Sequence, residues 1–538
     1  MKKNNTIKVV LITTLVFLVL SWIFKAAYFS GEFVEQGRVQ MGLFDLFNYP
    51  LTALSYFGYI ALYLLVIGGF YGILYKIPAY RNLLDKISHT FNNKGMLFLS
   101  IVVVLFALLV SICGLQIGLA LVIPFVVSII LLLGYDKIVA SIVVIGSLAA
   151  GLAGSTYGVT NLNVLTSSLG IDINYQIWVR VVILLVGIVL VIFNAFMYIK
   201  RSMKIVKAEK TTVKKAEKEE IKVASKVEPE KKTTKNQVKN TSSKTSTSKK
   251  SSASSKKSPS KSRKSVNKAA LKDEDIVVIK ENVDNSRDFL VPKAVSTKHK
   301  VWPLITLFVL LFILFVLAFL PWSAVFKVDL FDKALEGFNG FKLFGFPIFA
   351  KIFGTVNSFG NWMITDMFLP LALVVLILSI IYKVSLDDVI DGFIAGAKKA
   401  FKPAFVALLL YSVLVLVTYH PFQLTLYKFI IGKKFNVVKE VVTAILASLF
   451  NVDPSYSFQS VLPYLVSVVK DTGSYGLIGI IYQTMYGFTS LFAPTSLILM
   501  VSLTYLDVSY GSWLKNIWKL LLELFIIFLI IFIILALL

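Results

Sequence analysis

Long runs without a charged residue constrain this chain more than any other feature of its sequence. A helix that crosses a membrane needs about 20 mostly apolar residues, and several runs approach or exceed that length. Charged residues make up only 16% of the chain, against about 25% in soluble domains. The sequence therefore predicts an all-α polytopic membrane protein and argues against a soluble enzyme. The charge-free runs are 9–24, 46–75, 95–135, 138–171, 181–199, 301–326, 367–382, 403–427, 454–469, 472–506 and 524–538.

Positive charge gathers in one segment between two hydrophobic halves. Residues 201–300 hold 28 of the 55 Lys and Arg residues and 12 of the 30 Asp and Glu residues. Within them, 239–268 is a low-complexity Ser/Thr/Lys tract that lacks the apolar surface needed to fold. We therefore expect an N-terminal membrane repeat (1–200), a disordered basic linker (201–300) and a C-terminal membrane repeat (301–538).

The basic tract has two interpretations. A polycation could tether anionic lipid headgroups or RNA. Lys alternates with Ser here without interleaved aromatic residues, which favours a solvated linker. We expect contact with membrane lipid and no nucleic-acid partner.

Reactive and metal-binding residue types are scarce. The single cysteine, Cys113, excludes a disulfide framework, and His89, His299 and His420 lie too far apart for a metal-ligand motif. No P-loop sequence is present. We expect no enzyme activity, no cofactor and no metal site.

Two of the charge-free runs are too long for one straight helix and resemble each other. Residues 138–171 and 472–506 each have a polar, glycine-containing centre, at 151–163 and 482–496 respectively. Each follows a segment with a possible break, and each precedes one more apolar helix. Each half also has a charged loop before its third helix, expected at 76–94 and 383–402.

This shared order is the pattern of a secondary transporter built from a repeat. A broken helix is tolerated in a bilayer only where its freed backbone is buried in protein or lines a cavity. The small residues could instead serve only to pack helices closely. Two interruptions at matching positions favour a binding site over packing alone.

The candidate ligands at both centres are hydroxyl, amide and glycine residues. Their oxygens and N–H groups suit a carboxylate or a cation, and half-helix N-termini favour an anion. Unwound backbone carbonyls could supply a cation site without a carboxylate. The first centre offers Gly154, Ser155, Thr156, Gly158, Thr160, Asn161 and Asn163. The second offers Gln483, Tyr486, Gly487, Thr489, Ser490, Thr495 and Ser496, and the preceding hairpin offers Ser455, Ser457 and Gln459.

Two carboxylates need separate interpretation. Asp453 is the only charge inside the second hairpin. It could carry a coupling proton, or it could cap the helix that begins after it; the sequence leaves both roles open. Asp136 is expected to fix a loop and not to bind substrate.

Seven motifs follow one another along both halves of the chain. They are SGEF (30–33), MGLFDLF (41–47), VIGGFYGIL (66–74), FALLVSICG (106–114), LLLGYDKIVASIVVIGSLAAGLAGST (131–156), DDVIDGFIAGAKKA (387–400) and FAPTSLILMVSLTYLDVSYGSWLKNIWKLL (492–521). Their order is a stronger signal than any one of them. In this order they resemble the YfcC-like carriers, relatives of the anaerobic dicarboxylate carrier DcuC and of the AbgT aminobenzoyl-glutamate transporters in the ion transporter superfamily.

The resemblance implies two inverted repeats with broken helices and re-entrant hairpins. It also implies an elevator-type carrier, a homodimer with a scaffold and a moving transport domain in the cytoplasmic membrane. The substrate would be a small anionic or zwitterionic solute such as a dicarboxylate, an amino acid or a small peptide. Coupling to sodium or protons is expected.

The sequence departs from the family pattern at its polar signatures. Gly158, Val159 and Thr160 replace an Asn-Pro-Phe, Ile117 and Gly118 replace a Glu pair, SYSF (455–458) replaces Ser-Gly-Ser-Gly, and Met485, Tyr486 and Gly487 replace Gly-Asp-Gly. Intramembrane charges are usually functional, so their loss should change the chemistry. The alternative is a degenerate, non-transporting scaffold whose basic linker recruits a partner or anionic lipid.

Overall fold

The computed structural model describes residues 4–30, 32–158, 165–167, 169–224, 290–295, 298–354, 356–431, 434–469 and 472–538. Side chains between 203 and 224 are outside that description. The chain divides into two units. The first combines Met1–Ile199 with Ile279–Leu538, and the second is Lys200–Val278. Most of the expected linker therefore lies outside the described residues.

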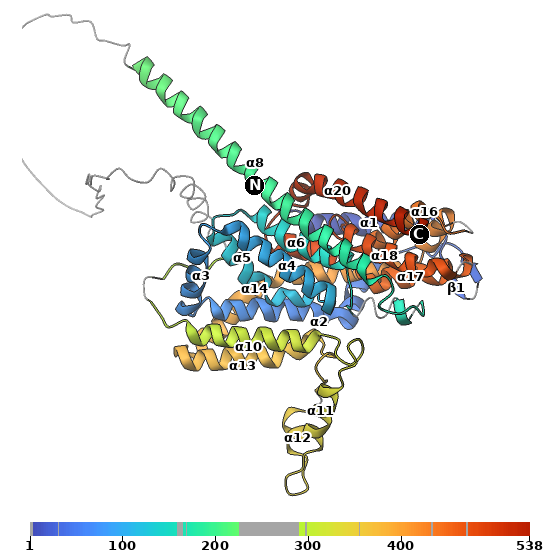
Figure 1. The fold of residues 1–538 in the computed structure, drawn as a ribbon, viewed down its shortest axis with the longest axis horizontal. Coiled ribbons are helices and arrows are strands. Elements are labelled where there is room, and N and C mark those ends of the chain that lie inside the picture. The colour runs from blue at the N-terminus through green and yellow to red at the C-terminus, as the bar shows by residue number, and fades with distance from the viewer. Residues whose placement is uncertain are drawn as a thin grey trace, which may run out of the picture. The chain divides into compact units, whose positions relative to one another are not determined.

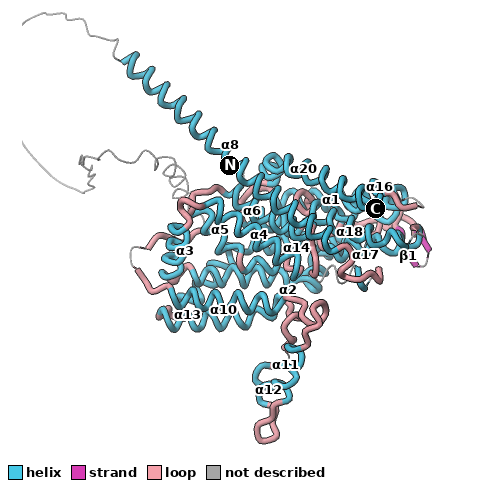
Figure 2. Tube along the Cα trace, in the orientation of Figure 1, coloured by secondary structure: helices cyan, strands magenta, loops and turns pink. Residues whose placement is uncertain are grey.

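The described part of the first unit is almost entirely helical (Figure 2). Eight helices in the described residues are long and apolar enough to cross a membrane. They are α1 (Thr6–Ile23), α2 (Asp45–Leu74), α4 (Gly95–Cys113), the first part of α8 (Ile177–Ala224), α10 (Trp302–Phe319), η3 (Ile364–Met367) continued by α13 (Phe368–Tyr382), α14 (Leu386–Tyr419) and α20 (Tyr510–Leu537).

The outer faces of several of these helices are apolar. Leu310 of α10, Ile380 of α13 and Ile530 of α20 are exposed, along with many other large apolar side chains. Contiguous exposed apolar surface of this kind marks contact with lipid or protein. The helix lengths and outer faces together fit a multi-pass membrane protein.

Shorter helices connect or interrupt the long ones (Figure 1). They are α3 (Pro78–Thr90), η1 (Ile117–Leu121), α5 (Ile123–Leu132), α6 (Lys137–Ala153), α11 (Leu330–Gly340), α12 (Ile348–Phe353), α15 (Gln423–Ile430), α16 (Val437–Phe450), α17 (Pro454–Val468), η4 (Thr472–Ser474), α18 (Tyr475–Thr489) and α19 (Leu497–Tyr505).

The element order in the two halves is similar in part. The first half contains the series α2, α3, α4, η1 with α5, α6 and α8. In the second half α10 to α13 come first, and the series α14, α15, α16, α17, α18, α19 and α20 follows. In each series the fifth helix, α6 or α18, ends in a non-helical interruption. The interruptions lie within the two centres that the sequence singles out.

The expected charged loops at 76–94 and 383–402 are largely helical, so that prediction was wrong. The first holds α3, and α14 begins in the second at Leu386. The Ser385 hydroxyl caps α14 by accepting a hydrogen bond from the Asp388 N–H at 3.1 Å. The charges there belong to an amphipathic helix, because Gly392 and Gly396 on the same stretch are buried.

Helices α2 and α14 form the most extensive contact between described elements. Lys76 pairs with Asp388 at 3.6 Å, and the rings of Phe57 and Tyr411 stack with centroids 4.4 Å apart. Tyr49 stacks on Tyr419 near the opposite end. Because partner numbers rise in α14 as they fall in α2, the two helices run antiparallel.

Glycines allow this close approach. A Cβ on Gly72 would lie 2.1 Å from the Gly392 carbonyl oxygen, and one on Gly396 would lie 2.1 Å from the Gly68 oxygen. Both pairs, Gly68 with Gly72 and Gly392 with Gly396, have the small-xxx-small spacing that lets membrane helices touch backbone to backbone. The crossing therefore requires glycine on both helices.

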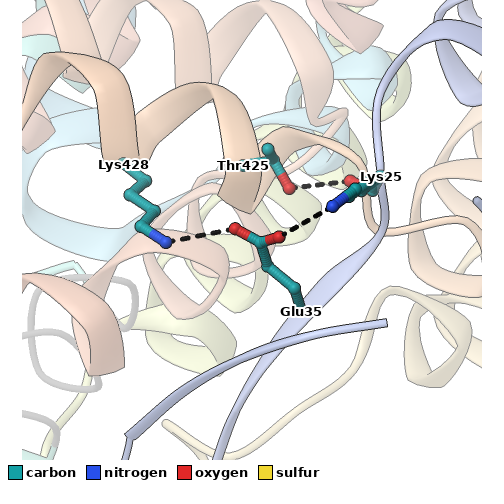
Figure 3. A network of polar contacts seen from close by, with 4 residues as sticks. All are labelled: Lys25, Glu35, Thr425 and Lys428. Atoms are coloured by element: carbon teal, nitrogen blue, oxygen red, sulfur yellow. Dashed lines mark hydrogen bonds and ion pairs between the residues drawn. The ribbon is translucent and has the colours of Figure 1, made fainter. Parts of the chain in front are cut away.

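A β-hairpin ties the segment after α1 to the second half. Strands β1 (Ala27–Ser30) and β2 (Glu32–Glu35) pair antiparallel. Glu35 bonds to Lys428 at 3.1 Å and to Lys25 at 3.3 Å, and the Thr425 hydroxyl donates to the Lys25 carbonyl oxygen at 2.7 Å (Figure 3). Lys428 first and then Lys25 hold the pKa of the Glu35 carboxyl below its usual range. The network joins the hairpin to α15.

We predict that Gly72→Ala destabilises the protein by about 1–3 kcal/mol, the range for overpacking a tight contact. The new methyl group would collide with the Gly392 backbone, which cannot rotate away. The measurement is the Tm of the purified protein in detergent.

Gly511→Ala is the matched control, because no heavy atom lies within 4 Å of a Cβ built there. Its Tm should stay level or rise, since Ala forms helix better than Gly. Equal losses in both variants would contradict the proposed role of the glycine crossing.

Candidate functional site

The first broken centre begins where α6 ends. Asp136 caps the start of α6 by accepting a hydrogen bond from the Val139 N–H at 2.9 Å, which confirms its expected structural role. The helix ends at Gly154, where a Cβ would lie 2.4 Å from the Leu184 backbone of α8. Only glycine allows α8 to approach this closely.

Ser111, at the end of α4, holds the unwound chain that follows. Its carbonyl oxygen accepts from the N–H groups of Thr156, Tyr157 and Gly158, at 2.9, 3.2 and 3.2 Å. Its hydroxyl donates to the Gly154 carbonyl oxygen at 2.8 Å. One serine thus satisfies much of the backbone that the break releases.

The predicted hydroxyls at this centre are engaged in the same contact. Those of Ser155 and Thr156 donate to the Ser111 carbonyl oxygen, at 3.4 and 3.2 Å. Gly158 packs against Gly114, because a Cβ on Gly158 would lie 2.9 Å from the Gly114 Cα. The main role of these residues is therefore to stabilise the conformation of the interruption. Thr160, Asn161 and Asn163 lie outside the described residues.

Arg180 is the residue at this centre that the sequence analysis missed. Its side chain is 0% exposed. Its guanidinium donates to the carbonyl oxygens of Thr156 at 2.7 Å and Tyr175 at 3.1 Å, and also to that of Ile173. Its Nε has no hydrogen-bond partner, and no ion pair joins Arg180 to a described carboxylate.

A buried cation without an ion-pair partner is costly, because desolvation of a charge is offset only by excellent hydrogen bonding or an opposite charge. Three carbonyl dipoles supply part of that stabilisation here. The remaining N–H of Nε can donate one charge-assisted hydrogen bond to a carboxylate oxygen, which is stronger than a bond between neutral groups.

Helix α18 of the second half closes over the same break. Gln483 donates from Nε2 to the Ser155 carbonyl oxygen at 2.8 Å and to that of Ala153 at 3.3 Å. Thr484 also donates to Ala153, at 3.1 Å. A Cβ on Gly487 would lie 2.2 Å from the Ala153 nitrogen. The structure therefore brings predicted residues of both halves together at the end of α6.

The second broken centre uses most of its predicted residues for structure. The Tyr486 hydroxyl donates to the Val452 carbonyl oxygen at 2.8 Å, Ser490 to Gly487 at 2.6 Å and Thr495 to Leu449 at 2.9 Å. The Ser496 hydroxyl accepts from the Leu499 N–H at 3.3 Å and so caps α19. The buried Thr489 hydroxyl and the buried Oε1 of Gln483 have no partner.

The predicted hairpin residues occupy different environments. Asp453 immediately precedes α17, and its carbonyl oxygen accepts from the Ser457 N–H at 3.0 Å, as expected of a residue at the N-cap position. Ser457 is buried and Gln459 is exposed. The side chain of Ser455 lies outside the described residues.

Glu440, on α16, is the second functional candidate missing from the sequence analysis. It is 1% exposed, and its Oε2 accepts from the Tyr482 hydroxyl at 3.2 Å. Both Arg180 and Glu440 border apolar runs, so a search for charge-free stretches stops at them and counts them as loop residues. The helical spacing of apolar residues continues on both sides of each charged residue, and this spacing was the signal that could have identified them.

A cavity of about 1210 Å³ lies elsewhere, along the α2–α14 crossing. Its lining includes the basic residues Lys76, Arg81, Lys293 and Lys399, and otherwise is mainly apolar. None of the described site residues lines it. Among the described residues, no group of three His, Cys, Asp or Glu side chains could hold a metal ion.

We predict that Gln483→Leu lowers the free energy of unfolding by about 1–3 kcal/mol, because the buried Ser155 carbonyl oxygen loses a donor. Gln459→Leu is the control, since that side chain is exposed. Thermal unfolding of both purified variants checks this; an unchanged Tm in Gln483→Leu would contradict the assigned contact.

One solved structure aligns with this chain along nearly its whole length. The crystal structure of the YdaH transporter of Alcanivorax borkumensis aligns over 98% of this chain and 96% of that chain, with 12% sequence identity and a TM-score of 0.35. A search of curated protein sequences returns no significant match.

The sequence also matches a family profile described as the C4-dicarboxylate anaerobic carrier, DcuC, over residues 18–241 and 266–537. These ranges cover most of both halves, which confirms the expected relationship to DcuC. The chain therefore belongs to the DcuC family of C4-dicarboxylate anaerobic carriers, a family of membrane transporters and not of enzymes.

Proposed function

We propose that this protein is a secondary active transporter that moves a small dicarboxylate across the cytoplasmic membrane. Membership in the C4-dicarboxylate carrier family supports the substrate class. The observation that carries the proposal is Arg180, a fully buried guanidinium at a broken helix whose Nε has no partner. A carboxylate is the ligand that such a group binds best.

Binding would use donors and acceptors from both halves. Arg180 would hold one carboxylate of the substrate against the unwound chain after α6. The unpartnered Thr489 hydroxyl and Gln483 Oε1 supply further polar groups beside the interruptions. The same two oxygens would also be suitable ligands for a sodium ion. Coupling of transport to sodium or protons is part of the proposal.

The proposed architecture is a pair of inverted repeats. The partly similar element order of the two halves and the antiparallel packing of α2 and α14 support it. In this scheme η1 with α5, and α17, are the re-entrant hairpins. Elevator-type movement and a homodimer in lipid, both implied by the family resemblance, belong to the same proposal.

The alternative is a scaffold that no longer transports and whose basic linker recruits a partner or anionic lipid. Most of that linker lies outside the described residues. Purely structural polar groups in a buried core are nearly always paired. The unpartnered atoms of Arg180, Gln483 and Thr489 therefore favour transport over the scaffold.

The direct test is uptake by proteoliposomes that contain the purified protein. We predict saturable, gradient-dependent uptake of labelled succinate, and exchange of external label for internal succinate. Competition by dicarboxylates, amino acids and dipeptides would define the substrate class. A wild-type protein that neither takes up nor exchanges any of them would contradict the proposal.

We further predict that Arg180→Lys raises the KM for the dicarboxylate about ten- to a hundredfold, the loss expected for one hydrogen bond to a charged group. Lysine keeps the charge but lacks the planar fork. Arg201→Lys is the matched control, because Arg201 lies on the same helix with an exposed side chain. Equal KM values in both variants would remove Arg180 from the binding site.

A further inference from the structure

Glu440 is a carboxylate buried inside the helical bundle. It lies in the first turn of α16, and only 1% of it is exposed. Carboxylates are almost never buried to this extent unless they are paired or functional. The transport site described above does not use it.

The groups around Glu440 do not neutralise its charge. Tyr482, on α18, donates its hydroxyl to Oε2 at 3.2 Å. Lys439 is the cation acting on the carboxylate, but it is the adjacent residue and its side chain is exposed. Tyr427, on α15, is fully buried close to this pair. No ion pair to Glu440 occurs in the described part of the chain.

This environment suits an acid that exchanges a proton. Burial disfavours the ionised form, because the carboxylate loses water without gaining a counter-ion. One hydroxyl donor stabilises the ionised form again, though less than a cation would. Because burial favours the protonated form and the hydroxyl donor favours the ionised form, the carboxyl group can change its protonation state when its surroundings change.

Glu440 is also connected to the proposed substrate site. Its partner Tyr482 directly precedes Gln483, whose amide bonds to the carbonyl oxygens of Ala153 and Ser155. The Ser155–Thr156 segment is in turn held by Arg180 through the Thr156 carbonyl oxygen. Movement of α18 against α6 would therefore alter both the carboxylate and the anion site.

We infer that Glu440 is the site of a coupling proton, and this inference rests on the proposed function. The Glu440 carboxylate takes one proton from water on the side where substrate enters, and becomes a neutral carboxylic acid. The proton crosses with the substrate and returns to water on the other side, which regenerates the carboxylate. No other bond changes, and the cycle moves one proton with each substrate.

A structural role for Glu440 makes a different prediction. An acidic residue in the first turn of a helix interacts favourably with the helix dipole. Asn436 already caps α16 by accepting from the Lys439 N–H at 3.1 Å. If Glu440 served only the helix, a neutral amide would affect stability and leave proton coupling intact.

The experiment uses proteoliposomes loaded to give an alkaline interior, with the membrane potential clamped at zero and labelled succinate outside. A gradient of about one pH unit supports about tenfold accumulation when one proton accompanies each substrate. We expect wild-type protein to reach this level. Glu440→Gln should lose the accumulation and retain succinate exchange. Glutamine resembles the neutral, protonated glutamate, so the variant can still carry bound succinate across the membrane in both directions.

Glu523→Gln is the matched control. Glu523, on α20, is half-buried and accepts a hydrogen bond from Asn194 at 3.0 Å, outside the α16–α18 contact that holds Glu440. Both accumulation and exchange should survive in this variant. A Tm measured for each variant shows whether it folds.

The outcomes separate the two proposals. Succinate exchange without accumulation in Glu440→Gln supports the inference. Accumulation that persists in Glu440→Gln would overturn the inference and leave the transport function standing. Loss of both activities in a folded Glu440→Gln would assign the residue to substrate movement itself and also overturn the inference. Absence of any transport in the wild type would overturn both proposals.

Tyr482→Phe decides the question if Glu440→Gln does not fold. Removing the hydroxyl withdraws the donor that stabilises the carboxylate, so the protonated form persists to higher pH. The pH of half-maximal succinate accumulation should therefore rise. An unchanged pH dependence in this variant would contradict the inference.

Discussion

The glycine-lined contact between α2 and α14 is the constraint on which the rest of the first unit depends. Apolar burial gives membrane helices little reason to associate, because lipid tails are as apolar as their side chains. Close packing must hold them instead, and Gly68, Gly72, Gly392 and Gly396 let the two backbones touch. Each half contributes one helix to this pair, so the contact joins the halves along their length.

The interrupted helices α6 and α18 contact each other. In the described part of the first interruption, the protein itself supplies hydrogen-bond partners for several freed backbone groups. Ser111 accepts three N–H groups of the first interruption, and Gln483 reaches across from the second half. The same residue types that the sequence offers as ligands therefore hold the interruptions in shape. Among the described side chains at the two interruptions, the buried Arg180 Nε, Gln483 Oε1 and Thr489 hydroxyl have no hydrogen-bond partner.

Sequence reasoning placed the helices and both interruptions well, because long apolar runs and clustered Gly, Ser and Thr are local signals. It also identified Asp136 correctly as a structural residue. It missed α14 before residue 403, because charges on one exposed face of a helix look like a loop when only charge-free runs are counted. Arg180 and Glu440 were missed for the same reason. Arg180 bonds to Thr156, 24 positions away, and Glu440 bonds to Tyr482, 42 positions away, so local sequence does not show these partners.

The sequence by itself determined that the chain is a helical membrane protein, where its apolar helices break, and to which family of carriers it is related. These properties follow from composition, from the length of apolar runs and from the order of local motifs, all of which can be read without knowing the fold. Only the tertiary structure decided which polar groups form hydrogen bonds within the protein and which are left without a partner. That outcome depends on how α6, α8 and α18 pack together, because the partner of a buried group is set by three-dimensional neighbours and not by the adjacent sequence.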